Sequence, residues 1–513
     1  MTLRDRIAQL VIGVAYGDVY STESDDYKKY HHWITDSHIG GLIVINEVEF
    51  GSARNANPFA MAVFLNQMQR LSKLPLLVGG DFERAASMRV TGGTQFPHSM
   101  AFGAANDLTA SRYEGLITAR EARALGVHWV FAPVADVNNN PRNPVINIRS
   151  YGEDPDLVSQ HVAAFIQGAH QDPAANVLVT AKHFPGHGDT DVDSHIGLPT
   201  LNIPRYRMDA TELKPFRVAI ANHVDSIMTA HMAVPELDAS GVPATVSPKV
   251  LTDLLRNEMK FEGLIVTDAM NMQGLSEMFS TGEASVRSIL AGADVLLMPP
   301  DPDLAIRAVA SAVENGRIPK QRINESAVRV LAAKIRLGLL KKRLVNVDEI
   351  ADTLASPEAA ARAQEIADHG VTLLRNENNV VPLAPASRSC LVLINSLRDV
   401  TARPTPGPRV SPPRDQRTSV HRRYHHAFAC PRSRDGSGQG LQRDRRSILR
   451  RHHRQDRRRE SVPRKIDPGQ SAGDHRDLQR SLYGQRFPES RRVFDALQFR
   501  ALRRSRRRES SLR

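Results

Sequence analysis

The most informative segment for the expected fold is Asn176-Val-Leu-Val-Thr-Ala-Lys-His-Phe-Pro-Gly-His-Gly-Asp-Thr-Asp-Val-Asp-Ser-His195. Its first residues form an apolar run that is typical of a buried strand. The fourteen residues from Lys182 to His195 hold one lysine, three histidines and three aspartates. Enzymes with parallel sheets keep their reactive groups on loops at strand ends. We therefore interpret this stretch as a strand that leads into a functional loop.

Similar aliphatic runs recur on both sides of this strand, and amphipathic helical patterns such as 58–71 and 156–170 separate them. Buried strands that alternate with helices predict a parallel sheet with right-handed crossovers. Eight strands over roughly 300 residues favour a (β/α)₈ TIM barrel. A doubly wound sheet is the alternative, but no glycine-rich dinucleotide motif follows the first strands. The predicted strands are 9–13, 41–45, 76–80, 127–134, 176–181, 225–230, 264–267 and 294–298.

A polar residue follows nearly every predicted strand. Because all strands of a barrel end at the same rim, a barrel would gather these residues on one face, whereas an open sheet would spread them along an edge. The barrel is therefore the better interpretation. The residues concerned are Asn46, Asp81, Asp136, Lys182, His183, His231 and Asp268.

Beyond the strands, the sequence predicts further domains. We expect residues 1–340 to form the barrel, 341–356 a linker, 357–398 the start of a second α/β sandwich domain, and 399–513 a tail of low order. Within the barrel we expect further helices at 208–222 and 248–259, and helices at 303–314 and 320–337 that close it. In the second domain we expect a helix at 357–369 and strands at 370–374 and 390–394.

The tail carries the excess positive charge. Residues 401–513 hold 30 Arg and 1 Lys against 11 Asp and Glu, a net charge of 31 − 11 = +20, so residues 1–400 carry 12 − 20 = −8. Such a segment buries too little apolar surface to fold. One hypothesis is a tail that binds nucleic acid. We favour a frameshift, since the second domain stops within a strand, and we expect no nucleic-acid partner. Resequencing the gene would decide between these hypotheses.

Two cysteines, Cys390 and Cys430, provide neither a disulfide framework nor a zinc-binding spacing. No apolar run approaches the length of a transmembrane helix, so we expect no membrane association. The first residues lack a small-residue cleavage site. A cytoplasmic location is expected, or a periplasmic or secreted one if the true start lies upstream.

Asp268 ends the apolar run Gly263-Leu-Ile-Val-Thr-Asp268. A carboxylate at the end of a buried strand is held rigidly, which suits a nucleophile or a group that stabilises positive charge. The alternative is an aspartate that caps the next helix.

Asp193 and His195 lie two residues apart in the glycine-containing loop. A carboxylate beside an imidazole fixes the tautomer of the ring and raises its basicity, which suits general acid/base catalysis near neutral pH. Alternatively, each could be an ordinary loop residue. A metal site formed by His183, His187, Asp189 and His195 is less favoured, because the group lacks a recognised ligand spacing.

Arg149, Asp81 and Arg89 also lie near strand ends. They could hold the hydroxyl groups of a polyol or the carboxylate of an acidic ligand. The alternative is a salt-bridge network at the rim of the barrel.

Lys182-His-Phe-Pro-Gly-His-Gly-Asp-Thr190, followed by Asp193-Ser-His195, resembles the signature of glycoside hydrolase family 3, and specifically of its bacterial β-N-acetylhexosaminidase branch. The resemblance covers the whole barrel, roughly residues 1–340, and extends into the start of the second domain. It implies a retaining, two-step hydrolysis on a TIM barrel without metal or organic cofactor. It also implies that Asp268 is the nucleophile and that His195, oriented by Asp193, is the general acid/base, in place of the usual second carboxylate.

The resemblance further implies sugar contacts by Asp81, Arg89, Arg149, Lys182 and His183. The family pattern Asp-x-Glu-Gly-Gly is altered, because Arg84 and Ala85 replace the two glycines. The Asp-to-Arg spacing is kept, but the local backbone is expected to differ. We expect His187 and Asp189 to shape the loop.

The expected substrate is a cell-wall or chitin-type glycan with a terminal N-acetylglucosamine, as in peptidoglycan recycling. Two alternatives stay open. One is another family 3 activity, either a β-glucosidase or a phosphorylase. The other is a protein without catalysis, because its second domain is truncated. The resemblance implies that β-glucosidases of the family take their acid/base from that second domain.

Overall fold

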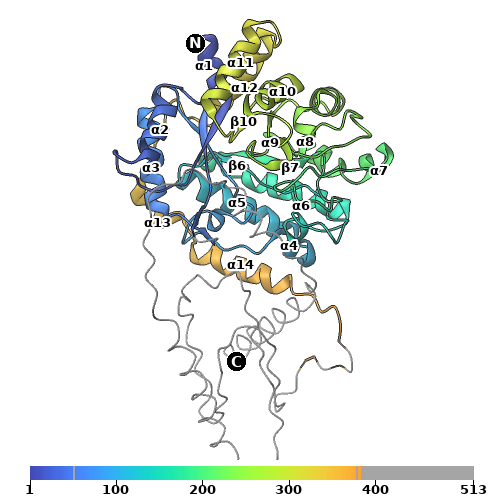
Figure 1. Ribbon diagram of the computed structural model, residues 1–513. Coiled ribbons are helices and arrows are strands. Elements are labelled where there is room, and N and C mark those ends of the chain that lie inside the picture. Colours follow the sequence, from blue (N-terminus) through green and yellow to red (C-terminus); the bar gives the residue numbers. More distant parts are fainter. Residues whose placement is uncertain (50–51, 377–378, 380, 383–513) are drawn as a thin grey trace, which may run out of the picture. The chain divides into compact units, whose positions relative to one another are not determined.

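The computed structural model describes residues 1–49, 52–376, 379 and 381–382. The chain divides into two compact units, Met1–Leu374 and Arg375–Arg513, and the fold below is that of the first. Its centre is a parallel eight-stranded sheet in the order β10-β1-β2-β5-β6-β7-β8-β9 (Figure 1). The strands are β1 (Val11–Ala15), β2 (Gly41–Val44), β5 (Leu77–Gly80), β6 (Trp129–Val130), β7 (Leu178–Phe184), β8 (Ser226–Thr229), β9 (Leu264–Val266) and β10 (Leu296–Leu297).

The sheet closes into a ring between its two end strands. A parallel bridge joins Val266 of β9 to Val295, the residue that enters β10. The backbone N–H of Thr267 donates to the carbonyl oxygen of Val295 at 3.1 Å, and that of Val295 donates to Ile265 at 3.1 Å. All eight predicted strands are present within a few residues of their predicted bounds, so the predicted (β/α)₈ barrel is confirmed.

Helices follow the strands and cover the outside of the ring (Figure 1). Several begin where an Asn, Asp or Ser precedes a proline. Asn57 caps the helix that starts at Pro58, and Ser356 caps the one that starts at Pro357. The covering helices are α2 (Asp25–Thr35), α3 (Pro58–Leu71), α5 (Leu108–Ala124), α6 (Pro155–Ala169), α8 (Lys214–Ala221), the π-type helix η5 (Lys249–Glu258), α10 (Thr281–Ala291) and α11 (Pro302–Glu314).

Shorter elements complete the unit. The helix α1 (Leu3–Ala8) lies beside α11 and α12 (Lys320–Arg336) at the amino-terminal side (Figure 1). The loops at the other side carry the hairpin β3 (Glu47–Glu49) and β4 (Ser52–Arg54) and short helical turns. The remaining helical elements are η1 (Ala86–Met88), α4 (Ser99–Ala105), η2 (Asn147–Arg149), η3 (Pro173–Ala175), α7 (Arg205–Ala210), η4 (Ala244–Val246), α9 (Gln273–Ser276), η6 (Val347–Glu349), α13 (Ile350–Thr353) and α14 (Pro357–His369).

The core of the barrel requires very close packing between neighbouring strands. Gly41 is one position where only glycine fits, because a Cβ atom there would lie 1.9 Å from the carbonyl oxygen of Leu77. Trp129 is fully buried, and its indole N–H donates to the hydroxyl oxygens of Thr180 and Ser226, both at 2.8 Å. The polar end of the indole is therefore satisfied inside the core, as buried tryptophans require.

Two predicted elements are wrong. The predicted helix 208–222 is two helices, α7 and α8, because Pro215 lies in the first turn of α8 and a proline is not tolerated within a continuous helix. The predicted strand 370–374 is not formed. Leu373 and Leu374 are 53% and 72% exposed, and the described residues offer them no neighbouring strand. The predicted strand 390–394 and the segment 399–513 lie outside the described residues.

The segment 341–356, which we predicted as a linker, is ordered along the barrel. The backbone N–H of Val345 donates to the side chain of Asn66 at 2.9 Å. The following helix α14 lies along α4 (Figure 1), and Arg362 forms an ion pair with Asp107 at 2.8 Å. The first compact unit therefore continues past the barrel helices to Leu374. The domain bounds beyond that residue stay a prediction.

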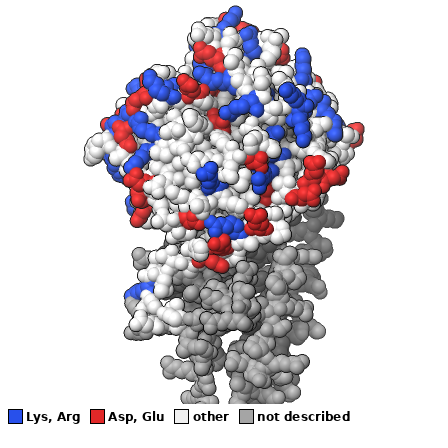
Figure 2. All heavy atoms as spheres, turned by 180° about the vertical axis from the view of Figure 1, so that it is seen from behind, with Lys and Arg blue, Asp and Glu red and all other residues white. Residues whose placement is uncertain are grey.

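The surface of the unit mixes charges of both signs, as the face in Figure 2 illustrates. Within the part of the chain that the structure describes, every helix is too short or too polar to span a membrane.

Candidate active site

Polar side chains gather where the strands of the barrel end. Asp81 directly follows β5, Lys182 and His183 lie in the last part of β7, and Asp268 comes two residues after β9. Because the strands are parallel, these ends share the carboxyl-terminal rim, the face on which TIM-barrel enzymes keep their active sites.

Lys182 is the centre of an ion cluster that we define as Asp81, Glu83, Arg89, Arg149 and Lys182. Its side chain is 2% exposed, and its ammonium group lies 2.8 Å from Asp81 and 2.7 Å from Glu83. Arg89 donates to the other oxygen of Asp81 at 2.7 Å. Three cations therefore surround two carboxylates, and one positive charge is left uncompensated within the cluster.

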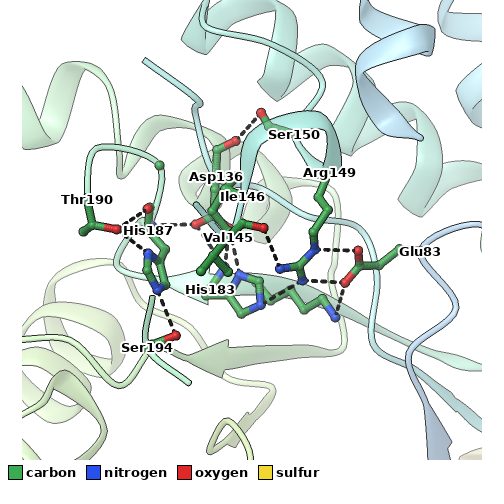
Figure 3. A network of polar contacts seen from close by, with 12 residues as sticks. Glu83, Asp136, Val145, Ile146, Arg149, Ser150, His183, His187, Thr190 and Ser194 are labelled. Atoms are coloured by element: carbon green, nitrogen blue, oxygen red, sulfur yellow. Dashed lines mark hydrogen bonds and ion pairs between the residues drawn. The ribbon is translucent and has the colours of Figure 1, made fainter. Parts of the chain in front are cut away.

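Arg149 completes the cluster from a different loop. Its guanidinium holds Glu83 with two bonds, from Nε at 2.9 Å and from Nη2 at 2.7 Å (Figure 3). The same Nη2 lies 3.4 Å from Nε2 of His183. Two parallel N–H···O bonds fix the plane of a guanidinium as well as its position. Arg149 thereby joins the ion cluster to His183.

The charges of the ion cluster are fixed by their mutual contacts. Burial would raise the pKa of Asp81, but the charges of Lys182 and Arg89 outweigh it and hold that pKa at about 2. Burial opposes the charged form of Glu83 as well, yet Arg149 and Lys182 keep its pKa well below the usual range. The two carboxylates in turn raise the pKa of Lys182 against the effect of its burial. The cluster therefore stays ionised at every physiological pH.

Asp136 orients His183 from behind. One of its oxygens lies 2.8 Å from Nδ1 of His183, and the carboxylate also accepts the backbone N–H of His183 at 3.2 Å (Figure 3). A carboxylate at Nδ1 requires that this nitrogen carry a hydrogen, which leaves the lone pair on Nε2. That lone pair faces the guanidinium of Arg149. The ring is therefore fixed in both orientation and tautomer.

Asp268 is half-buried and less constrained than the carboxylates of the ion cluster. Its Oδ1 accepts the backbone N–H of Ala269 at 2.7 Å, and the described residues provide no ion pair to it. Burial would raise its pKa, but electrostatic interaction with the neighbouring His183 and His231 side chains and the hydrogen bond from the Ala269 N–H lower it. The carboxylate is thus ionised and has lone pairs available for reaction.

Asp193 and His195 form a pair at the far end of the loop. Nδ1 of His195 lies 2.7 Å from Oδ1 of Asp193, and the same oxygen accepts the backbone N–H of His195 at 2.8 Å. This hydrogen bond raises the pKa of His195 above its usual 6.5, and the charge of Asp268 adds to the effect. The imidazole is 60% exposed. It can therefore carry a proton at neutral pH and exchange it with solvent or a ligand.

The two central residues of the loop hold it together. Nδ1 and Nε2 of His187 lie 2.7 Å from the hydroxyl of Thr190 and 3.0 Å from that of Ser194 (Figure 3). Asp189 forms an ion pair with Arg207 at 2.5 Å. These contacts are of the kind expected for residues that shape the loop.

These same contacts bear on the metal-binding alternative. His183, His187 and Asp189 each bond to a different partner, and His195 bonds to Asp193. Among the described residues, no three His, Cys, Asp or Glu side chains are arranged to hold a metal ion.

Sequence reasoning missed three members of the site. Glu83 had no predicted role, although its place two residues after Asp81 puts both side chains on one side of an extended segment. Asp136 was noted at a strand end without a function, and it holds His183. Asn46 was likewise noted, and its side chain accepts a hydrogen bond from Arg89.

The altered glycine positions have a visible consequence. Ala85 has φ +55° and ψ −161°, a conformation that glycine adopts easily and that strains a residue with a Cβ atom. Arg89 nevertheless reaches Asp81. The substitution therefore adds conformational strain to the backbone of the loop, but the contact between Asp81 and Arg89 is kept.

The chain is similar to known proteins in both sequence and structure. The model of the "Glycosyl hydrolase family 3 N terminal domain" matches residues 2–333. The chain is 34% identical to "Beta-hexosaminidase A" of Pseudoalteromonas piscicida over 70% of its own length and 65% of that protein's. It therefore spans just under two thirds of this relative.

Two solved structures are similar over most of the first unit. One is a glycoside hydrolase family 3 β-N-acetylglucosaminidase from Paenibacillus sp. str. FPU-7, with a TM-score of 0.67 and 37% identity over 74% of this chain and 70% of the other. The second is "Beta-glucoside phosphorylase BglX", with a TM-score of 0.67 and 26% identity over 75% and 67%.

Proposed function

The chain belongs to glycosyl hydrolase family 3, and on this premise we propose that it is a retaining β-N-acetylhexosaminidase that releases terminal N-acetylglucosamine. The observation that carries the proposal is the Asp193–His195 pair, whose histidine has a pKa raised first by Asp193 and further by the charge of Asp268. A proton donor and an ionised carboxylate that share one rim are the two groups that glycoside hydrolysis needs.

In the first step of the proposed reaction, a carboxylate oxygen of Asp268 attacks the anomeric carbon while the glycosidic C–O bond breaks. The imidazolium of His195 gives its proton to the departing oxygen, so that the aglycone leaves as a neutral alcohol. The product is a covalent glycosyl-enzyme and a neutral His195. Asp193 stabilises the imidazolium before the transfer and keeps the ring oriented afterwards.

In the second step, the neutral His195 takes a proton from water as the water oxygen attacks the anomeric carbon. The bond to Asp268 breaks, and its carboxylate is restored. Two displacements at one carbon retain the configuration of the sugar. Both residues return to their starting protonation states, so no cofactor enters the proposed cycle.

The ion cluster is proposed to hold the sugar itself. Lys182 and Arg149 are already paired with carboxylates, which fixes the positions of their N–H groups. Such groups can direct the hydroxyls of a sugar with little reorganisation on binding. We assign substrate contacts to Asp81, Arg89, Arg149, Lys182 and His183.

The proposed natural substrates are cell-wall or chitin-type glycans, as in peptidoglycan recycling, with the cytoplasm as the proposed compartment. The names of two relatives support the sugar: one is a β-hexosaminidase and the other a β-N-acetylglucosaminidase.

The test uses the full chain and a matched pair of aryl glycosides, the 4-nitrophenyl N-acetyl-β-glucosaminide and the 4-nitrophenyl β-glucoside. We expect release from the first at a kcat/KM at least about tenfold above that for the second, since a site that bonds a polar substituent rejects an analogue without it. NMR of the first-formed sugar should give the β anomer. Preference for the glucoside, or an α product, would refute the proposal.

Phosphorolysis is the second candidate. His195 is neutral after the first step, so it does not repel an incoming phosphate as a carboxylate would. A solved β-glucoside phosphorylase is among the similar structures. Faster turnover in phosphate, with a sugar 1-phosphate as product, would favour this activity. Absence of turnover by folded protein under both conditions would favour a protein without catalysis.

A further inference from the structure

We propose that His187 is a positioning residue that clamps Ser194 and thereby holds the acid/base corner, defined as Asp193, Ser194 and His195, in its working place. The inference rests on the proposed function, because it assigns His187 a role in the proton transfer by His195. It starts from a contact between the buried root of the loop and its exposed end (Figure 3).

The hydrogen bonds around His187 define its tautomer. The hydroxyl of Thr190 donates to the carbonyl oxygen of His187 at 3.0 Å, so its oxygen is left to accept from Nδ1 of the same residue at 2.7 Å. Nδ1 therefore carries the hydrogen, and Nε2 presents a lone pair. The hydroxyl of Ser194 lies 3.0 Å from Nε2 and donates to it.

His187 is itself fixed to the rigid part of the site. The ring is 1% exposed, and its burial lowers its pKa, which keeps it in the neutral form that can accept from Ser194. Its backbone N–H donates to Asp136 at 2.7 Å, and its carbonyl accepts from Asn143 at 2.8 Å. Asp136 also holds His183. The clamp thus begins on the carboxylate that orients the sugar-binding histidine.

The other side of the corner rests on the loop that follows Asp268. The backbone N–H of Gly274 donates to the carbonyl oxygen of Ser194 at 3.2 Å. A Cβ atom at Gly274 would lie 2.9 Å from the carbonyl oxygen of Gly197 and 3.1 Å from those of His231 and Ser194. Ser194 is therefore held from two sides, by His187 and by Gly274. Because Ser194 lies between Asp193 and His195 in the chain, fixing it fixes both.

The alternative is a purely structural role, in which His187 only provides hydrogen bonds to buried polar groups of the loop. In that case its replacement would lower the stability of the fold and would affect all substrates alike. The positioning role predicts a different signature. Displacing the acid harms reactions that need protonation of the leaving group, and it spares those with a good leaving group.

Two substitutions separate the contacts of His187. His187→Asn places an amide near the position of Nδ1, so that it keeps the contact with Thr190 and loses Ser194. His187→Gln places its amide oxygen near the position of Nε2, where it can accept from Ser194. With the full chain, kcat/KM is measured on the methyl and the 2,4-dinitrophenyl N-acetyl-β-glucosaminides.

For His187→Asn we expect a loss of about tenfold or more on the methyl glycoside and less than about twofold on the dinitrophenyl glycoside, since general acid catalysis contributes 10²-fold or more in total. His187→Gln should recover most of the loss. Equal losses on both substrates, or a Gln variant as impaired as the Asn variant, would overturn the proposal. Ser194→Ala, which removes the hydroxyl alone, should repeat the Asn pattern and replaces it if His187→Asn does not fold.

Hydrogen exchange gives a readout that needs no turnover. In His187→Asn and Ser194→Ala, amides of residues 189–197 should exchange at least about tenfold faster, and amides of strand β7 should not change. The control is His223→Asn, the same change at an exposed residue whose φ of +59° suits asparagine. Unchanged exchange at 189–197 would overturn the clamp. Absence of wild-type turnover would refute the proposed function and leave this measurement to decide the clamp.

Discussion

The two ends of the loop that runs from Lys182 to His195 differ in almost every physical property. Lys182 is 2% exposed and touches two carboxylates, whereas His195 is 60% exposed and touches one. The pKa of Lys182 is raised, so it keeps one charge state over the physiological range. That of His195 is raised from 6.5, which favours the protonated form of the ring. One motif therefore supplies both fixed charges and a mobile proton.

This contrast in burial and charge indicates how the site can separate substrate binding from proton transfer. Groups that hold a substrate work best when their partners and rotamers do not change, which burial and ion pairing ensure. A general acid/base must gain and lose a proton in each cycle, which deep burial would hinder. Placing the two kinds of group at opposite ends of one glycine-containing loop allows both. Asp268 is intermediate between these two kinds of group, since it is half-buried and forms no ion pair among the described residues.

We expect the greatest loss of activity from replacement of Asp268, the proposed nucleophile. Asp268→Ala should lower kcat/KM on aryl N-acetylglucosaminides by at least about 10⁴-fold, because it removes the nucleophile of the proposed mechanism. The unfolding free energy should change by less than about 1 kcal/mol, since Asp268 bonds, among the described residues, only the adjacent backbone. Asp268→Asn, which keeps the shape, should be equally inactive. Residual activity within tenfold of wild type would remove Asp268 from the mechanism.

The next effect tests the buried end. Lys182→Met removes the cation that lies between Asp81 and Glu83 and leaves each carboxylate with its arginine partner alone. Breaking a buried ion pair at one partner typically costs about 3–5 kcal/mol, and urea unfolding of the full chain measures it. Substrate affinity should weaken as well. A loss below about 1 kcal/mol would mean that the ion cluster is as loosely held as the exposed end.

The exposed end should behave in the opposite way. His195→Ala should lower kcat/KM by about 10²-fold on substrates with poor leaving groups and by less than tenfold on the dinitrophenyl glycoside. Its effect on stability should stay below about 0.5 kcal/mol, as is usual for an exposed pair. Equal catalytic losses on both substrates would exclude His195 as the acid. A large loss of stability would contradict the contrast between the two ends.

The parts of this site that the sequence could predict are those that depend on local pattern. Asn57 before Pro58 marks a helix start through the side-chain cap and the fixed φ of proline, and the helix 58–71 has its predicted bounds. Aliphatic runs likewise predict strands because the barrel buries both faces of each strand. The polar residues after the strands then follow from topology, since parallel strands share a rim.

What could not be predicted depends on contacts between distant segments. The bond between Lys182 and Glu83 joins two different strand ends, and no local pattern states which carboxylate a lysine will meet. Pro215 indicates the break between α7 and α8, but the apolar periodicity on both sides of it predicted one continuous helix. The clamp of Ser194 by His187 depends on the three-dimensional path of the loop.

The smallest expected effect is the dependence of stability on pH, and it distinguishes the two ends by the range in which each responds. The pKa of Asp81 is lowered to about 2, so its contribution is complete above the unfolded value near 3.9 and is lost as the pH falls toward 2. The pKa of His195 is raised from 6.5, so its contribution is present below 6.5 and is lost as the pH rises through the folded value. Between pH 5 and 6.5 neither end should change the unfolding free energy. From pH 6.5 to 9 the wild type should lose less than about 0.5 kcal/mol relative to His195→Ala, because the pair is exposed. Urea titrations of both proteins at each pH measure this difference. If the difference between the two proteins stayed constant from pH 6.5 to 9, His195 would not lose its stabilising contact in that range, and the contrast between a fixed and a titrating end would fail.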